Sequence, residues 1–327
     1  MRVILFTERN SPFGAAVMAR LSEHHGVHEL LIVTRDPARL CDYYLHDATS
    51  VSIPETAHRL GRSVLETDDI NSPETAARLD AYKPDVIVLA NYQLKVSSAI
   101  TRIAKRISIN FHPSPLPRYA GLAPFFWMAR NGETDAGVSC CLVEDRIDAG
   151  ALLHSVKISL TGRETSGEIR EKLFLASFDQ VTTVFDMLAR GNITPKPQDL
   201  QARRYYGKPR DVDLLIDWHQ STEDVMRIIR AGAPLPGAIT LLPNGKQVRI
   251  REAHALEAVP SPEPGTVSYH HGVPIIQTGN GAVRIISYSS YCPPTVEHLS
   301  LTPLRFNPSV PLPRPMVLTL LTPGAAI

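Results

Sequence analysis

The chain has 327 residues, of which 43% are hydrophobic and 20% are charged, so it can bury a substantial core and is not compositionally disordered. At about 100–200 residues per domain, this length fits one large domain or two ordinary ones. The 34 basic and 33 acidic side chains leave a net charge of +1. That balance argues against a nucleic-acid backbone as the dominant partner, because such proteins carry a marked basic excess.

The cysteines and the N-terminal segment indicate the compartment. Four cysteines occur without CxxC spacing, and Cys140 and Cys141 are adjacent, which is poor geometry for a mutual disulfide. This usage favours a reducing compartment. The apolar run Val3–Phe6 is too short for a signal-peptide core, and no uncharged apolar stretch reaches the roughly 18 residues of a membrane span. We therefore expect a soluble, cytoplasmic protein with no membrane contact.

In the first half of the chain, short apolar runs alternate with segments whose apolar residues have helical spacing. Helical segments are expected over 15–24 and around 98–106. Continuous apolar strands separated by helices predict a parallel sheet covered on both faces, that is, a doubly wound, Rossmann-like α/β fold. In such sheets, ligands bind at the carboxyl ends of the strands. The expected strands are Val3–Phe6, Leu30–Val33, Val64–Leu65, Asp85–Ala90 and Ile107–Phe111.

The second half of the chain has a different pattern of apolar runs and turns. A long amphipathic helix is expected from Thr165 to Arg190, and prolines then mark a linker. Short alternating runs separated by Pro- and Gly-containing turns follow a helix over 221–231, which predicts a small antiparallel sheet or OB-like barrel. The expected strands are 238–242, 247–251, 273–278 and 282–286. We predict a Rossmann-like domain over 1–195, a mainly β domain over 203–288, and an extended proline-rich tail over 289–327.

Several familiar motifs are missing from the sequence. Thr7–Gly14, after the first strand, contains one glycine and no G-x-G-x-x-G, so a dinucleotide dehydrogenase is disfavoured. Neither a G-x-x-x-x-G-K-[ST] loop nor an H-E-x-x-H pair is present, which argues against nucleotide hydrolysis and zinc protease chemistry. None of the twelve histidines has zinc-ligand spacing, so no metal is expected.

Two segments at strand ends carry residues suited to acyl transfer. Asn110 and His112 stand two residues apart at the end of a strand, so their side chains point to one side. Asp148 lies in a glycine-ended loop after an expected strand over 137–142. An amide can donate to a developing oxyanion, an imidazole can move a proton, and a carboxylate can orient that imidazole. Each segment alone is also compatible with an ordinary turn.

The two segments together resemble a known family. Asn-x-His-Pro-Ser-x-Leu-Pro-x-Tyr-x-Gly over 110–121, followed by Asp-x-Gly at 148–150, is similar to the formyltransferases that use 10-formyltetrahydrofolate. Ile216–Trp218, Pro236–Ala238 and Pro264–Val267 are similar to the C-terminal domains of methionyl-tRNA formyltransferase and of the formyltransferase acting on UDP-4-amino-4-deoxyarabinose. The resemblance covers about residues 1–288 and makes 1–195 the catalytic domain.

The resemblance implies a set of site residues. Asn110, His112 and Asp148 would form the catalytic triad, and 10-formyltetrahydrofolate would be the co-substrate, with no metal required. The family pattern has an arginine where this chain has Ala120, and this position would contribute to the acceptor pocket. The expected folate-side residues are Tyr92, Leu94, Val143, Asp145 and Ile147. The expected acceptor-side residues are Ser114, Pro115 and Ala120.

The sequence favours one class of acceptor for the formyl group but does not identify the acceptor itself. The tRNA-acting relatives have a basic loop after the second strand, whereas residues 34–42 here offer only Arg35 and Arg39, offset by Asp36 and Asp42. This favours a small amine, such as an amino sugar nucleotide or a biosynthetic amine. Methionyl-tRNA formyltransferase is the alternative, and a formyltetrahydrofolate hydrolase or an inactive binding protein are further ones. The oligomeric state is not specified by the sequence.

Four other features are expected to be structural. Cys141 is expected in a small apolar site without thiol chemistry. Trp218 is expected to pack in a core, and Arg203–Tyr206 is expected to be a solvated linker face, although it could bind phosphate. The pairs His24–His25 and His270–His271 are expected to be exposed loop residues.

Overall fold

In the computed structural model, which describes residues 1–35, 51–242, 245–256, 263–290 and 319–320, a seven-stranded sheet has the strand order β3-β2-β1-β4-β5-β7-β8. The pairs β1–β2, β2–β3, β1–β4 and β4–β5 are parallel, whereas β7 pairs antiparallel with both β5 and β8. The strands are β1 (Arg2–Phe6), β2 (Glu29–Thr34), β3 (Ser63–Glu66), β4 (Val86–Ala90), β5 (Ile107–His112), β7 (Asp135–Leu142) and β8 (Leu152–Ser159).

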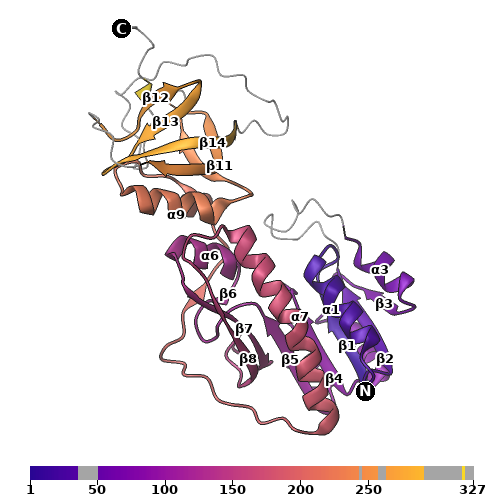
Figure 1. Ribbon diagram of the computed structural model, residues 1–327. Helices are drawn as coiled ribbons and strands as arrows, with labels where there is room; N and C mark the ends of the chain where they lie inside the picture. Colours follow the sequence, from indigo (N-terminus) through magenta and orange to yellow (C-terminus); the bar gives the residue numbers. More distant parts are fainter. Residues whose placement is uncertain (36–50, 243–244, 257–262, 291–318, 321–327) are drawn as a thin grey trace, which may run out of the picture. The chain divides into compact units, whose positions relative to one another are not determined.

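Helices cover both faces of this sheet (Figure 1). Helices α1 (Pro12–Glu23), α3 (Ile53–Arg59) and α7 (Ser166–Arg190) contribute to the core cluster on one face. Helices α4 (Pro73–Tyr82) and α5 (Ser98–Thr101) contribute to the cluster on the other. Successive residues of β1 divide between the two clusters, as period-two alternation requires. The predicted Rossmann-like sheet is therefore confirmed.

The chain divides into two compact units. The first contains residues 1–124, 135–159 and 170–208, and it holds the seven-stranded sheet. The second contains residues 125–134 and 160–169 together with the described residues from Pro209 onward. Most of α6 (Pro124–Asn131) and the start of α7 thus belong to the second unit, although both precede the predicted linker.

The second unit is built on a separate, mainly antiparallel sheet with the order β10-β11-β14-β13-β12-β15. Its amphipathic helix α9 (Thr222–Gly232) packs its apolar face on this sheet, with the fully buried Trp218 in the same cluster. A four-residue helix, α8 (Asp211–Leu214), precedes it. The strands are β10 (Ala238–Leu241), β11 (Gln247–Leu256), β12 (Thr266–His270), β13 (Val273–Gln277), β14 (Ala282–Ser290) and β15 (Thr319–Leu320).

Several predicted boundaries change. The helix expected around 98–106 is one turn long, because Ile103 to Lys105 leave the helix and residues 105–107 bond back to Pro84 and Asp85. β11 extends to Leu256, and β8 and β12 were not predicted. The proline-rich tail over 289–327 lies mostly outside the described residues; of it, Ser289 and Ser290 end β14 and Thr319–Leu320 form β15.

Candidate active site

Two neighbouring strands position the predicted catalytic residues. Asn110 and His112 are on β5, whose register places Asn110 opposite Cys141 and His112 opposite Ser139 on β7. The chain leaves β7 after Leu142 and returns at β8, and the connecting loop, residues 143–151, carries Asp148. The structure thus brings the side chains of Asn110, His112 and Asp148 together beside β5.

Asp148 is the centre of this arrangement. Its side chain is 6% exposed. The amide Nδ2 of Asn110 donates to Oδ1 of Asp148 at 2.9 Å, and the backbone N–H of Gly121 donates to Oδ2 at 2.8 Å. The residue has a φ of 53°, in the left-handed region that Asp tolerates better than most non-glycine residues. Both carboxylate oxygens are therefore fixed by donors from two other segments.

His112 is buried and oriented by two groups. Its Nε2 lies 3.0 Å from the carbonyl oxygen of Tyr119, and because a carbonyl only accepts, this nitrogen carries the hydrogen. In the neutral ring the lone pair is therefore on Nδ1. That atom lies 3.8 Å from Oδ1 of Asp148. A proton taken up at Nδ1 would face a carboxylate, which is the arrangement that stabilises a transient imidazolium.

The predicted folate-side residues fall into two groups. Tyr92 and Leu94 follow β4, Val143 follows β7, and all three pack against the same core cluster. The phenol oxygen of Tyr92 is buried without a hydrogen-bond partner in the described part of the chain, and burial, followed by the charge of Glu8, raises its pKa to about 12. Asp145 and Ile147 are exposed on the loop over 143–151.

The expected acceptor contacts of Ser114 and Ala120 are not supported. Both residues are 0% exposed. The hydroxyl of Ser114 donates to the carbonyl of Arg118, and Ala120 packs with Leu116 and Cys141 in a small apolar cluster. A short side chain at position 120 therefore fills the core instead of opening a pocket. Pro115 is half-buried, so it alone of the three retains surface.

Cys141 lies on β7 in that cluster and is 1% exposed. Burial raises the pKa of its thiol strongly, and the negative charge of Asp148 raises it further. The thiol therefore stays protonated, which agrees with the apolar, unreactive site expected from the sequence.

A segment expected to be a linker contacts the site. Strand β9 (Tyr205–Tyr206) pairs in parallel with β6 (Ala120–Gly121), and the N–H of Ala120 donates to the carbonyl of Arg204 at 3.0 Å. Gly121 has a φ of 99°, and a Cβ at this position would lie 2.2 Å from the carbonyl oxygen of Tyr206. Arg204 and Tyr205 are exposed, as expected of a solvated face, but the pairing of this segment with β6 was not predicted. Local patterns do not reveal a pairing between two-residue strands this far apart.

Arg35 also differs from its expected role. It is 3% exposed, and its guanidinium donates to Oε1 of Glu8, with an Nη2–Oε1 distance of 2.9 Å. The same oxygen accepts the backbone N–H of Gln93 at 2.8 Å. Arg35 and Glu8 therefore form an internal ion pair, which joins the ends of β1, β2 and β4. The remainder of the loop, residues 36–50, including Asp36, Arg39 and Asp42, lies outside the described residues.

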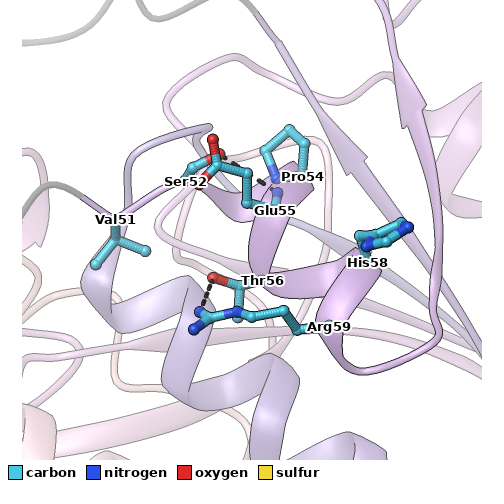
Figure 2. Close-up of a pocket in the computed structure, with 7 residues that line it drawn as sticks. All are labelled: Val51, Ser52, Pro54, Glu55, Thr56, His58 and Arg59. Carbon is cyan, nitrogen blue, oxygen red and sulfur yellow. Dashed lines mark hydrogen bonds between the residues drawn. The ribbon is translucent and has the colours of Figure 1, made fainter.

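A cleft of about 660 Å³ surrounds α3, and Figure 2 shows its lining residues. Some of its polar groups bond to one another: Ser52 accepts the N–H of Glu55, and the guanidinium of Arg59 donates to Thr56. None of the predicted site residues lines this cleft. We therefore assign it no part in the reaction.

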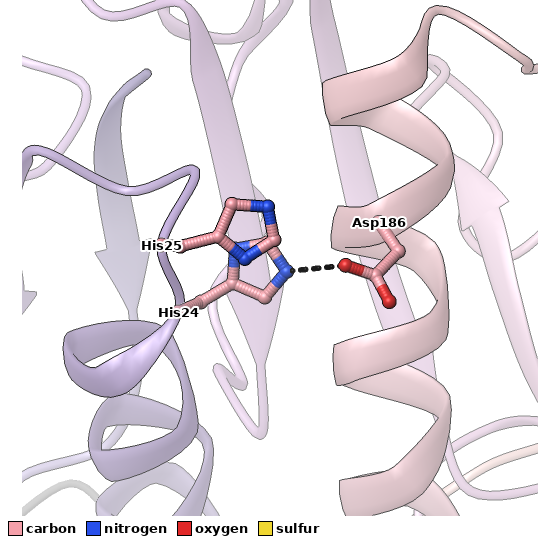
Figure 3. A group of neighbouring side chains, drawn as sticks. All are labelled: His24, His25 and Asp186. Carbon is pink, nitrogen blue, oxygen red and sulfur yellow. Dashed lines mark hydrogen bonds and ion pairs between the residues drawn. The ribbon is translucent and has the colours of Figure 1, made fainter.

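Figure 3 shows His24, His25 and Asp186, whose ligand atoms lie close enough together to hold a metal ion. His25 is exposed as expected, but the side chain of His24 is only 5% exposed, which corrects the expectation of an exposed pair. Nδ1 of His24 accepts the N–H of Gly26, so its Nε2 carries the hydrogen that Asp186 accepts at 3.2 Å. Both ring nitrogens of His24 thus have hydrogen-bond partners within the protein. His270 and His271 are exposed, as expected.

Among the described residues, no helix combines the length and apolarity needed to cross a membrane.

Comparisons with known proteins identify relatives of both units. A family model described as "Formyl transferase" matches residues 1–179, and one described as "Formyl transferase, C-terminal domain" matches residues 210–291. Methionyl-tRNA formyltransferase from Roseiflexus sp. (strain RS-1) is 32% identical over 243 residues, which cover 73% of this chain and 74% of the relative.

Two solved structures are similar in fold. An N-formyltransferase from Helicobacter canadensis, in complex with folinic acid and dTDP-3-aminofucose, superposes with a TM-score of 0.67 at 14% identity. The match covers 89% of this chain and all of that protein. HypX from Aquifex aeolicus, in complex with tetrahydrofolic acid, gives a TM-score of 0.60 at 21% identity and covers 89% of this chain and 44% of HypX.

Proposed function

This chain belongs to the formyl transferase family, and we propose that it transfers the formyl group of 10-formyltetrahydrofolate to the primary amine of a small molecule, such as an amino sugar nucleotide or a biosynthetic amine. The observation that carries the reaction is the set of contacts around Asp148, which joins Asn110 and the ring of His112.

Each of the three residues has a distinct task in this proposal. One amide hydrogen of Asn110 is bonded to Asp148, which leaves the second for the formyl oxygen, where negative charge develops during attack by the amine. His112 takes the proton of the attacking amine at Nδ1 and returns it to the departing folate nitrogen. Asp148 stabilises the imidazolium in between, because its carboxylate faces Nδ1 at 3.8 Å. The formyl carbon–N10 bond breaks as the new amide bond forms, so no oxidant or reductant is needed.

The residues near Tyr92 fit a flat heteroaromatic ring. The side chains of Tyr92, Leu94 and Val143 pack against one core cluster, and the buried phenol of Tyr92 has no hydrogen-bond partner among the described residues. Ring systems with polar edges bind in sites of this composition, where apolar side chains supply contact area and a few polar groups fix orientation. We therefore place the pteridine on this side of the triad.

The ion pair of Arg35 supports a small acceptor. An acceptor stem of tRNA is bound by neutralising several phosphates, and each arginine removed from the surface lowers the affinity and its salt dependence. Arg35 cannot serve this role while its guanidinium is buried against Glu8. A small amine needs no such surface, only a path to the triad.

Methionyl-tRNA is the second candidate acceptor, and a specific observation favours it. The relatives at 29–32% identity are named methionyl-tRNA formyltransferase, and they align over 70% or more of this chain. A formyltetrahydrofolate hydrolase is a third possibility in chemical terms, because water can replace the amine at the same triad.

The proposed reaction is tested by incubating the purified enzyme with 10-formyltetrahydrofolate and a panel of amino sugar nucleotides and biosynthetic amines. We expect one amine to gain the mass of a single formyl group while tetrahydrofolate is released in equal amount. Formate release at the same rate without any amine would instead identify a hydrolase. The variant His112→Ala controls for uncatalysed transfer.

A further inference from the structure

The segment over 196–206, which we call the strap, runs along the loop that carries Asp148. At its start, Lys196 and Leu152 exchange backbone hydrogen bonds of 2.7 and 2.8 Å. At its end, β9 pairs with β6, and the ring of Tyr206 stacks on Tyr119, with 5.2 Å between centroids. The strap is thus fixed on both sides of the active site within the first unit.

Between these ends, side chains of the strap bond to the backbone of the loop. The amide Nε2 of Gln198 donates to the carbonyl of Asp148 at 3.1 Å and to the carbonyl of Gly150 at 2.7 Å. The guanidinium of Arg203 donates to the carbonyl of Ile147 at 2.9 Å. Both amide hydrogens of Gln198 are therefore used on the loop, one of them on the catalytic residue itself.

The loop needs support of this kind. Residues 144–147 are exposed, so burial of their side chains cannot hold the loop in place. Asp148 has the left-handed φ of 53°, a conformation that persists in a non-glycine residue when surrounding groups determine it. Its carboxylate must also keep its distance from His112, because a displacement of about 1 Å at a catalytic group can cost on the order of 100-fold in rate.

We propose that Gln198 is a positioning residue, which acts through the backbone of residues 148–150 to hold the carboxylate of Asp148 opposite His112. This inference rests on the proposed function for its kinetic part. It assigns a role in the reaction to a residue that is 50 positions from Asp148 in the sequence and belongs to none of the motifs of the triad.

The test compares Gln198→Met, which keeps the length of the side chain and removes its donors, with Gln201→Met. Gln201 lies in the same strap with an exposed side chain, so it is a matched control. Gln198→Glu is the second variant, because it keeps the shape and replaces the donor by acceptors that face two carbonyls. Both kcat and the KM for 10-formyltetrahydrofolate are measured, together with hydrogen exchange of the peptide over 143–152 in the free protein.

For Gln198→Met and Gln198→Glu we expect kcat to fall by about tenfold or more. We expect the KM for 10-formyltetrahydrofolate to stay within about twofold, with faster exchange over 143–152; Gln201→Met should match the wild type. Full kcat in either Gln198 variant, or a raised KM at unchanged kcat, would overturn the proposal. The exchange measurement needs no substrate. If the wild type formylates no amine, the proposed function fails, while unchanged exchange in Gln198→Met would overturn the positioning role separately.

Discussion

Replacing Asp148 by Asn should lower the turnover of the enzyme much more than it lowers the stability of the fold. Asparagine keeps the size of the side chain and tolerates a φ of 53°, but it removes the charge opposite His112 and one of the two acceptor oxygens. The donors of Asn110 and Gly121, at 2.9 and 2.8 Å, then meet one oxygen and one NH₂ group. A buried donor left without a partner costs about 1–3 kcal/mol of stability.

The effect on turnover should be larger than the effect on folding. Loss of general acid–base support costs about 10²–10⁴-fold in rate, which corresponds to about 3–5 kcal/mol of barrier. We therefore expect Asp148→Asn to remain folded and to lose at least about 100-fold in kcat. The assay measures kcat for Asp148→Asn, His112→Ala and the double variant, with the folded fraction of each determined by urea unfolding.

The double variant is the sharper control. Residues that act as a unit give losses that do not multiply, so the double variant should be no slower than about the slower single variant. A kcat for Asp148→Asn within tenfold of the wild type would refute the reasoning. So would a loss in the double variant equal to the product of the two single losses, because it would mean that the residues act independently.

Three further predictions follow from single positions. Gly121→Ala places a Cβ 2.2 Å from the carbonyl of Tyr206 at a φ of 99°, so it should lower stability by about 1–3 kcal/mol and reduce kcat; unchanged urea midpoint and kcat would be inconsistent with the close approach. Burial raises the pKa of Glu8 above its ordinary 4.5, so the folded state holds this proton more tightly than the unfolded chain does. The stability of the wild type relative to Glu8→Gln should then fall as pH rises above about 4.5, and parallel stability–pH curves would contradict it. Trp218→Ala should cost about 3–5 kcal/mol by thermal unfolding, since the ring is 0% exposed and donates to Thr240; a loss below about 1 kcal/mol would count against its place in the core.

The sheet could be predicted because its signals are local. The central parallel strands β1 and β4 contain continuous apolar runs, because helices bury both faces of the sheet there. The helix expected from Thr165 to Arg190 is α7, Ser166–Arg190, which has 25 residues, and a pattern of that length is hard to mistake. One-turn α5 and the two-residue strands β6 and β9 are too short to leave a periodic signal.

The candidate site was predictable only in part, for the same reason. Asn110 and His112 share one strand, and their alignment follows from the two-residue period. Neither the contact between Gln198 and Asp148 nor the burial of Arg35 against Glu8 has a local pattern, because each joins segments that only the fold brings together. The interpretation of Ala120 needed the fold for another reason. A small residue can either open a pocket or fill a core, and only its packing distinguishes the two.

The measurement that tests the central claim most directly is a comparison of acceptors under one set of conditions. Purified enzyme and 10-formyltetrahydrofolate are supplied with charged initiator tRNA or with amino sugar nucleotides, and the kcat/KM of each is measured at several salt concentrations. We expect a small amine to be formylated efficiently, with kcat/KM nearly independent of salt, since its recognition does not require neutralising several phosphates. Efficient formylation of the tRNA, with a steep salt dependence and no small amine accepted, would contradict the proposed acceptor.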